Sequence, residues 1–166
     1  MEILDVVNNL DEVIATAERS RVYEEKLPHR IVHVLLFNTA GKMALQLRSQ
    51  NVSFMPNTWS TAVGGHVRTG ETYEQAALRE SREELGVELA LDEIHKDFYK
   101  ALGLQKFLRT FRASFEGPFE PDPQDVASVD FFSLEQIQKM LTSGEQFHPE
   151  LTFLLAKHYG VIEPRS

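Results

Sequence analysis

The feature that most constrains the fold of this chain is a helix whose two ends are both marked in the sequence. Thr72 and Gln75 have the spacing of a capping box, and Gly86 stands where a glycine commonly ends a helix. The helix is therefore predicted over residues 73–85. An unbroken β-branched and apolar run at 31–37 predicts a strand buried on both faces, against which such a helix can pack.

The rest of the chain alternates between strand and helix signals. Further strands are predicted at 3–7, 43–48, 59–63, 107–115 and 126–132, and further helices from 134 to about 144 and over 150–159. A hairpin followed by mixed strands and helices predicts an α/β or α+β sandwich. Residues 1–27 are interpreted as an N-terminal extension that packs on a single domain formed by residues 28–163.

Composition excludes several classes of protein. The formal net charge of -8 disfavours nucleic-acid binding, because an acidic surface repels phosphate backbones. The chain has no cysteine, which rules out disulfides, thiolate nucleophiles and cysteine-bound metal centres, and fits a cytoplasmic protein. It has no apolar run of about 18 residues, so no membrane span is expected, and its first residues do not resemble a signal peptide.

The chemistry is concentrated on the predicted helix. Glu80, Glu83 and Glu84 recur at i, i+3 and i+4, which places their carboxylates on one helix face. Clustered carboxylates repel one another, and hard cations such as magnesium prefer oxygen ligands of this kind. The alternative is a solvated acidic face on which Arg79 and Arg82 serve as intrahelical partners.

The residues around this helix resemble the Nudix box. From Gly65 to Val87 the sequence reads GHVRTGETYEQAALRESREELGV, and eight defined positions match the box at the required spacing. They are Gly65, Glu71, Arg79, Glu80, Glu83, Glu84, Gly86 and Val87. Eight matches within twenty-three residues are a specific signal.

The resemblance implies a mixed sheet between helices, with the box forming a loop–helix–loop. It also implies a hydrolase that cleaves a phosphoanhydride bond in a nucleoside diphosphate derivative or a similar small diphosphate, using Mg²⁺ or Mn²⁺. Glu80, Glu83 and Glu84 would bind the metal, with a backbone carbonyl at Gly65 joining them, and one carboxylate would help to deprotonate the attacking water. Arg79 and Glu71 would pair to hold the loop against the helix.

One position departs from the box. Ser81 occupies a slot that is usually aliphatic, on the side of the helix that carries Leu78 and Leu85. A buried hydroxyl there is expected to bond back to the Ala77 carbonyl. The departure concerns packing, because serine is not an expected ligand of the metal.

Residues 27–34 and 59–66 are also similar to the isopentenyl-diphosphate isomerase branch of the superfamily, and more closely to its hydrolase-like bacterial relatives. In this alignment Gly64 replaces the catalytic cysteine of the isomerase, which disfavours isomerisation. His29 and His66 fall where the isomerase places metal-binding histidines. Whether either binds metal here stays open, since histidines are more often structural.

Substrate contacts are predicted for Arg48, His66 and Arg68, because arginine grips phosphate bidentately and His66 follows Gly65 directly. Other residues have a possible functional role and a plainer one. Candidates for phosphate contact, or for solvated charges at a strand edge, are Lys106, Arg109 and Arg112. Candidates for stacking on a substrate group, or for core packing, are Phe54, Trp59 and Phe107. Asp125 falls where the resemblance to the Nudix family implies a catalytic carboxylate outside the box in some members, or it ends a turn.

Two alternatives to a hydrolase are weighed: a non-catalytic ligand-binding or regulatory Nudix module, and an isopentenyl-diphosphate isomerase. The intact acid set argues against the module, and the missing cysteine against the isomerase. The expected partner is a small diphosphate, with no nucleic acid and no membrane, and the chain is either a monomer or a homodimer. The sequence does not identify the substrate, the number of metal ions or the carboxylate that acts as base.

Overall fold

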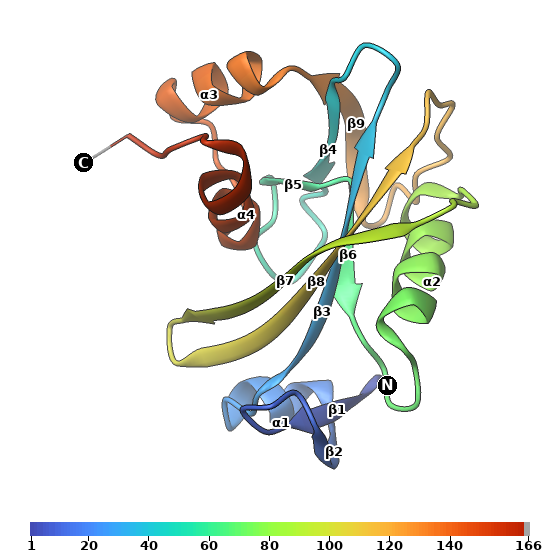
Figure 1. The fold of residues 1–166 in the computed structure, drawn as a ribbon, viewed down its shortest axis with the longest axis vertical. Coiled ribbons are helices and arrows are strands. Elements are labelled where there is room, and N and C mark those ends of the chain that lie inside the picture. The colour runs from blue at the N-terminus through green and yellow to red at the C-terminus, as the bar shows by residue number, and fades with distance from the viewer. Residues whose placement is uncertain (165–166) are drawn as a thin grey trace.

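The computed structural model describes residues 1–164 and consists of a mixed sheet between helices. Seven strands form the sheet in the order β5-β4-β3-β8-β7, with β6 paired to β3 and β9 paired to β4. Helix α2 covers one face, and α3 and α4 cover the other (Figure 1). The predicted α/β/α sandwich is thereby confirmed. The elements are β1 Ile3–Val7, β2 Val13–Glu18, α1 Arg19–Glu24, β3 His29–Phe37, β4 Met43–Arg48, β5 Trp59–Thr61, β6 Val63–His66, α2 Tyr73–Leu85, β7 Asp92–Ala101, β8 Leu104–Ser114, β9 Val126–Phe132, α3 Leu134–Thr142 and α4 Pro149–Tyr159.

Strand β3 is the centre of the molecule and is buried on both faces, as its apolar run predicts. It pairs in parallel with β8 and antiparallel with β6. Because side chains alternate along a strand, Val32 and Val34 pack with α2 in one core cluster, whereas Leu35 and Phe37 pack with α4 in another. The same alternation turns His33 toward the α4 side.

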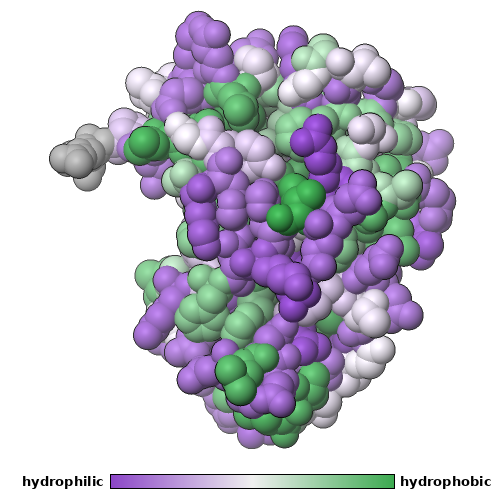
Figure 2. Space-filling view, in the orientation of Figure 1, coloured by the Kyte–Doolittle hydropathy of each residue, from purple (hydrophilic) through white to green (hydrophobic). Residues whose placement is uncertain are grey.

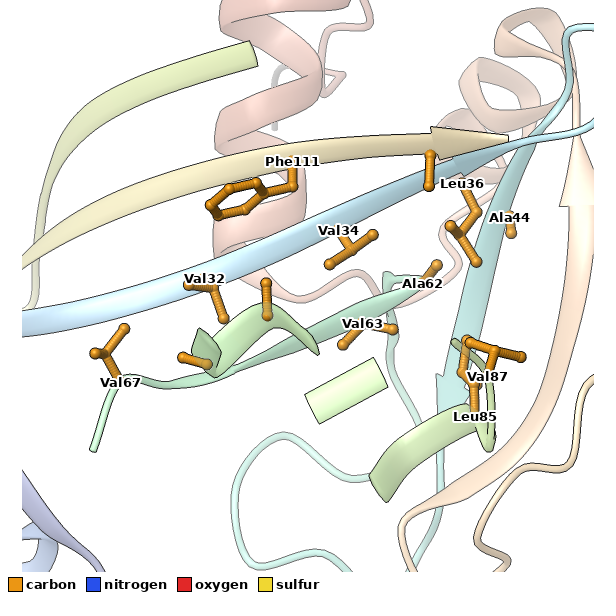
Figure 3. Close-up of a cluster of buried hydrophobic side chains, with 13 residues drawn as sticks. Val32, Val34, Leu36, Ala44, Ala62, Val63, Val67, Leu85, Val87 and Phe111 are labelled. Carbon is orange, nitrogen blue, oxygen red and sulfur yellow. The ribbon is translucent and has the colours of Figure 1, made fainter. Parts of the chain in front are cut away.

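The α2 side of the core is shown in Figure 3, where Val32 and Val34 lie near Val63 of β6, Val67 and the end of α2. Ala76, Ala77 and Leu85 are fully buried against the sheet. The two alanines have no bulk that would hold the helix away. Ser81 is also fully buried, and its hydroxyl donates to the Ala77 carbonyl at 2.7 Å, which confirms the bond expected from the sequence.

Some elements differ from the prediction. The strand expected at 59–63 is two strands, and the glycines at 64 and 65 lie inside β6 rather than after a strand. The edge strand β7 was not predicted, because its residues are mostly charged or exposed and give no apolar run. The short elements β2 and α1 were also missed, since only Ala17 and Val22 in them are buried.

The first 24 residues form a small unit at one end of the sheet (Figure 1). Strands β1 and β2 pair as a hairpin, and Leu4, Val6, Ala17 and Val22 form a core cluster of their own. The unit contacts the loop before α2 through a bridge between Leu4 and Arg68 and through a hydrogen bond from the Thr69 amide to the Ile3 carbonyl at 2.8 Å.

The surface in Figure 2 is mainly hydrophilic, with a small hydrophobic group at the lower end, over the N-terminal unit. Within residues 1–164 no helix is both long enough and apolar enough to cross a membrane.

Candidate active site

A cavity of about 710 Å³ lies between α2, α4 and the N-terminal unit. This volume is in the range of ligand pockets that hold small organic molecules. Its charged and histidine lining comes from every layer of the molecule: Glu2, Arg19, His33, Arg48, His66, Glu80, Glu83, Glu84, Lys106, Asp125, His148 and Glu150.

One wall of the cavity is formed by the three glutamates of α2. Glu80 and Glu84 are each 9% exposed, and Glu83 is exposed. Burial raises the pKa of both Glu80 and Glu84, and the negative charge of Glu80 adds to the effect on Glu84. The raised pKa values mean that a second negative charge is unfavourable when both carboxylates lie this close together in a buried place. A nearby positive charge would stabilise the ionised form of both side chains.

Arg79 fixes the loop before α2 to the helix. Its guanidinium makes two hydrogen bonds to the Glu71 carboxylate, at 2.7 and 2.8 Å, and one to the His66 carbonyl at 3.0 Å. It also bonds to Glu80 at 2.9 Å and to Glu83 at 3.2 Å. The forked pair between Arg79 and Glu71 is the pair that the box implies. Because one side chain reaches both the loop and two glutamates, it sets their relative positions.

The glycines of β6 leave space for two different side chains. A Cβ atom on Gly65 would overlap the Glu80 carboxylate, and one on Gly64 would lie 3.2 Å from Nδ1 of His33. Successive residues of a strand face opposite sides. Gly65 therefore makes room for the glutamates of α2, and Gly64 makes room for His33.

The α2 wall carries carboxylate oxygens, which are the kind of ligand that divalent cations bind. Gln46 donates to Oε1 of Glu84 at 2.8 Å, and Oε2 of Glu84 is buried with no hydrogen-bond partner among the described residues. Carboxylate oxygens of this kind suit Mg²⁺ or Mn²⁺. Within residues 1–164 no three acidic or histidine side chains stand as a complete ligand set. Arg79 holds Glu80 and Glu83 in ion pairs instead.

The other predicted contact residues are distributed around the cavity. Arg48 and His66 line it, and burial lowers the pKa of both side chains. Arg68 is not among the lining residues, and it pairs with Glu2 at 3.3 Å and with Glu83 at 3.9 Å. His29 is fully buried outside the lining, with its Nδ1 at 2.9 Å from the Leu27 carbonyl.

The wall opposite α2 was largely missed from the sequence. It contains His33, Lys106, His148 and Glu150, of which only Lys106 was considered, as one of several basic residues. A histidine in the middle of an apolar strand was a usable signal for His33. Glu150 gave no such signal, because an acidic residue is ordinary in the first turn of a helix.

Comparison with known proteins identifies the family. The model of the NUDIX domain matches residues 27–155. A Nudix hydrolase of Deinococcus radiodurans is 31% identical over 163 residues, covering 95% of this chain and 94% of the relative. An uncharacterised Nudix hydrolase of Yersinia pestis is 29% identical, covering 100% of this chain and 94% of the relative.

A solved structure has the same architecture. The crystal structure of DR0079 from Deinococcus radiodurans superposes with a TM-score of 0.83 and 30% identity, covering 95% of this chain and 99% of that one. The fold and the site thus define an enzyme that hydrolyses acid anhydrides in phosphorus-containing compounds. The chain belongs to the Nudix family.

Proposed function

We propose that this chain is a metal-dependent pyrophosphohydrolase that cleaves a small diphosphate, such as a nucleoside diphosphate derivative, by attack of water. The observation that supports it most is the unpartnered buried Oε2 of Glu84, which lies in the cavity wall beside Glu80. A buried oxygen without a partner is costly. A divalent cation would remove that cost and the mutual repulsion of the two carboxylates.

Glu80, Glu83 and Glu84 would hold the cation, together with the backbone carbonyl at Gly65. When bound, Mg²⁺ or Mn²⁺ would neutralise the diphosphate and lower the pKa of a coordinated water. It would also resolve the conflict between an anionic substrate and a chain of net charge -8.

The chain's own residues would position these groups. Gln46 bridges the Ala62 carbonyl and Glu84, at 2.9 and 2.8 Å, and so fixes the rotamer of a buried carboxylate. Arg79 holds Glu80 through a charge-assisted hydrogen bond and anchors the end of β6, which carries Gly65 and His66. Arg48 would contact the substrate's phosphate oxygens from across the cavity.

The test is a panel of nucleoside diphosphate derivatives and other small diphosphates, incubated with Mg²⁺ and assayed for phosphate or monophosphate release. For each hydrolysed compound the reaction is repeated in ¹⁸O-labelled water, and attack by water is expected to place one ¹⁸O atom in a product phosphate. Chelation of the metal should abolish turnover, and added Mg²⁺ or Mn²⁺ should restore it.

Variants connect the activity to the α2 wall. Glu83→Gln and Glu84→Gln should each lower kcat at least 100-fold, because an amide binds a divalent cation far more weakly than a carboxylate. Glu74→Gln is the matched control, since Glu74 is an exposed glutamate on the same helix and lies outside the cavity lining. Undiminished activity in both of the first two variants would reject the proposed metal site.

A further inference from the structure

The wall opposite α2 contains a second buried group of charges, formed by His33, Lys106 and Glu150. Their exposed fractions are 3%, 3% and 4%. The side chains come from β3, β8 and α4, so the parallel pairing of β3 with β8 and the packing of α4 bring them together. Oε1 of Glu150 lies 2.8 Å from Nε2 of His33, and Oε2 accepts from the Lys106 ammonium at 2.8 Å.

The hydrogen bonds of this group determine where its protons lie. The Thr61 hydroxyl has one proton and lies 2.9 Å from the Val63 carbonyl and 2.8 Å from Nδ1 of His33. A carbonyl oxygen can only accept, so both hydrogen bonds form together only when Nδ1 of His33 donates. At Nε2 the partner is a carboxylate, which only accepts, so Nε2 carries a hydrogen as well.

A protonated Glu150 would reverse this assignment, but its surroundings oppose that. Burial by itself would raise the pKa of Glu150, and it is outweighed by the hydrogen bond from His33 and by the charge of the Lys106 ammonium, which lower that pKa below its ordinary value. With all of these hydrogen bonds formed, the group consists of an imidazolium, an ammonium and one carboxylate. Two positive charges and one negative charge leave a net charge of +1 in a buried place.

Nothing else in this group compensates for that charge. Tyr23 and Phe54 present their rings to the Lys106 ammonium, at 5.3 and 6.0 Å from the ring centroids. Arg19 and Arg48 line the same cavity, and so do Glu2 and Asp125, so these four side chains balance one another and leave the surplus charge in place. A buried net charge without a counter-ion is unfavourable. The cavity thus has an acidic wall on α2 and a basic wall opposite.

We propose that His33, Lys106 and Glu150, with Arg48 beside them, form a second anion subsite that binds a phosphate group of the substrate other than the diphosphate that is cleaved. Lys106 supplies the charge and Glu150 orients it, while His33 gives the group its positive sign. With the proposed function this defines the substrate class, a small diphosphate that carries a further phosphate at its other end. The identity of the substrate rests on the proposed function, but the subsite itself does not.

The direct test is calorimetric titration of the full chain with inorganic phosphate in the absence of divalent cations. Without a cation the α2 wall repels phosphate, so saturable binding reports the basic wall. Wild type should bind one phosphate, and the double variant Lys106→Gln/Glu150→Gln should bind it at least 10-fold more weakly. The double variant replaces an ion pair by two amides, and a neutral His33 can accept from the new amide at 150, so the fold is preserved.

The phosphate affinity of two single variants distinguishes an anion subsite from a merely structural ion pair. Glu150→Gln should bind phosphate at least as tightly as wild type, because it removes a negative charge and frees the Lys106 ammonium. Lys139→Gln removes an exposed lysine of α3 and should leave binding unchanged. No saturable phosphate binding by wild type, or equal binding by the double variant, would overturn the subsite.

A kinetic test uses two matched substrates, ribose 1-diphosphate with and without a phosphate on its 5-hydroxyl, each with Mg²⁺. The phosphorylated compound should have at least 10-fold higher kcat/KM, and this preference should disappear in the double variant. Equal rates for the two compounds in wild type would contradict the substrate class. If neither compound is hydrolysed, the proposed substrate class fails, and metal-free phosphate binding still decides the subsite separately.

Discussion

The two walls of the cavity are built in different ways. The α2 wall takes its three carboxylates from five consecutive positions of one helix, and the basic wall takes its three charged groups from residues 33, 106 and 150. On the first wall like charges are crowded together, and we propose that a divalent cation compensates for them. On the second wall opposite charges satisfy one another and leave a surplus of one positive charge. Under the two proposals, a single cavity binds a metal on one side and an anion on the other.

The largest expected effect is on the free energy of unfolding, and it compares the loss of a buried ion pair with the loss of a surface ion pair. Lys106→Met should lower the free energy of unfolding by about 3–5 kcal/mol, because it leaves Glu150 buried beside a single remaining partner. Lys139→Met should change it by less than about 0.5 kcal/mol, since the Lys139–Glu135 pair is exposed. Urea unfolding followed by circular dichroism measures both. Similar losses in the two variants would show that the basic wall is solvated.

The neighbouring glycines Gly64 and Gly65 of β6 allow each wall to be tested with a single alanine substitution, which adds one methyl group. Gly65→Ala should lower kcat about 100-fold, because its Cβ would displace the Glu80 carboxylate. Gly64→Ala should lower kcat less than about 10-fold, since its Cβ meets the ring of His33 at 3.2 Å and the Thr61 hydroxyl at 3.4 Å and does not reach the glutamates of α2. Steady-state kinetics on the best substrate of the panel gives both values. If the order were reversed, Glu80 would not be part of the catalytic wall.

The basic wall should also respond to pH through His148, which caps α4. Burial lowers the pKa of His148 to about 4, whereas an unfolded histidine titrates near 6.5. The unfolded state therefore binds more protons between pH 6.5 and pH 4, so stability falls as the pH falls through this window. We expect this residue to contribute a loss of about 2–3 kcal/mol.

His148→Asn is the informative variant, because asparagine can still cap the helix but does not titrate in this range. It should reduce the slope of stability against pH between 6.5 and 4, while stability at pH 7 changes little. Thermal unfolding at a series of pH values measures the slope. An unchanged slope would mean that His148 is accessible to protons in the folded state.

The smallest expected effect concerns the geometry of the α2 wall. Arg79→Lys keeps the positive charge but loses the forked pair with Glu71 and the bond to the His66 carbonyl, so kcat should fall about 10-fold. Arg82→Lys is the control on the same helix, because Arg82 is exposed and pairs with Glu88, which lies outside the cavity lining. Equal activity of the two variants would show that charge alone, and not the fork, supports the glutamates.

The α2 wall could be predicted from the sequence, whereas the wall opposite it could not. Glu80, Glu83 and Glu84 share a helix face whatever the rest of the chain does, and the capping box and Gly86 fix the helix ends, so this wall could be predicted. The apolar run of β3 likewise predicts a central strand. The meeting of His33 with Glu150 depends on the register between β3 and β8 and on the docking of α4, which no local pattern contains. Strand β7 was not predicted for another reason. It lies at the edge of the sheet, where charged residues are tolerated, so its sequence lacks the apolar pattern that predicts a strand.

The N-terminal unit has its own four-residue core and still supplies Tyr23 and Arg19 to the cavity. Tyr23 bonds to His66 at 2.6 Å, so a part that could be mistaken for an accessory reaches the loop of the Nudix box directly. The cavity is therefore lined both by the N-terminal unit and by the part of the chain that carries the Nudix box. A lesion that loosens only the smaller one would leave the sheet and all three glutamates in place and would still produce a protein that holds its substrate badly.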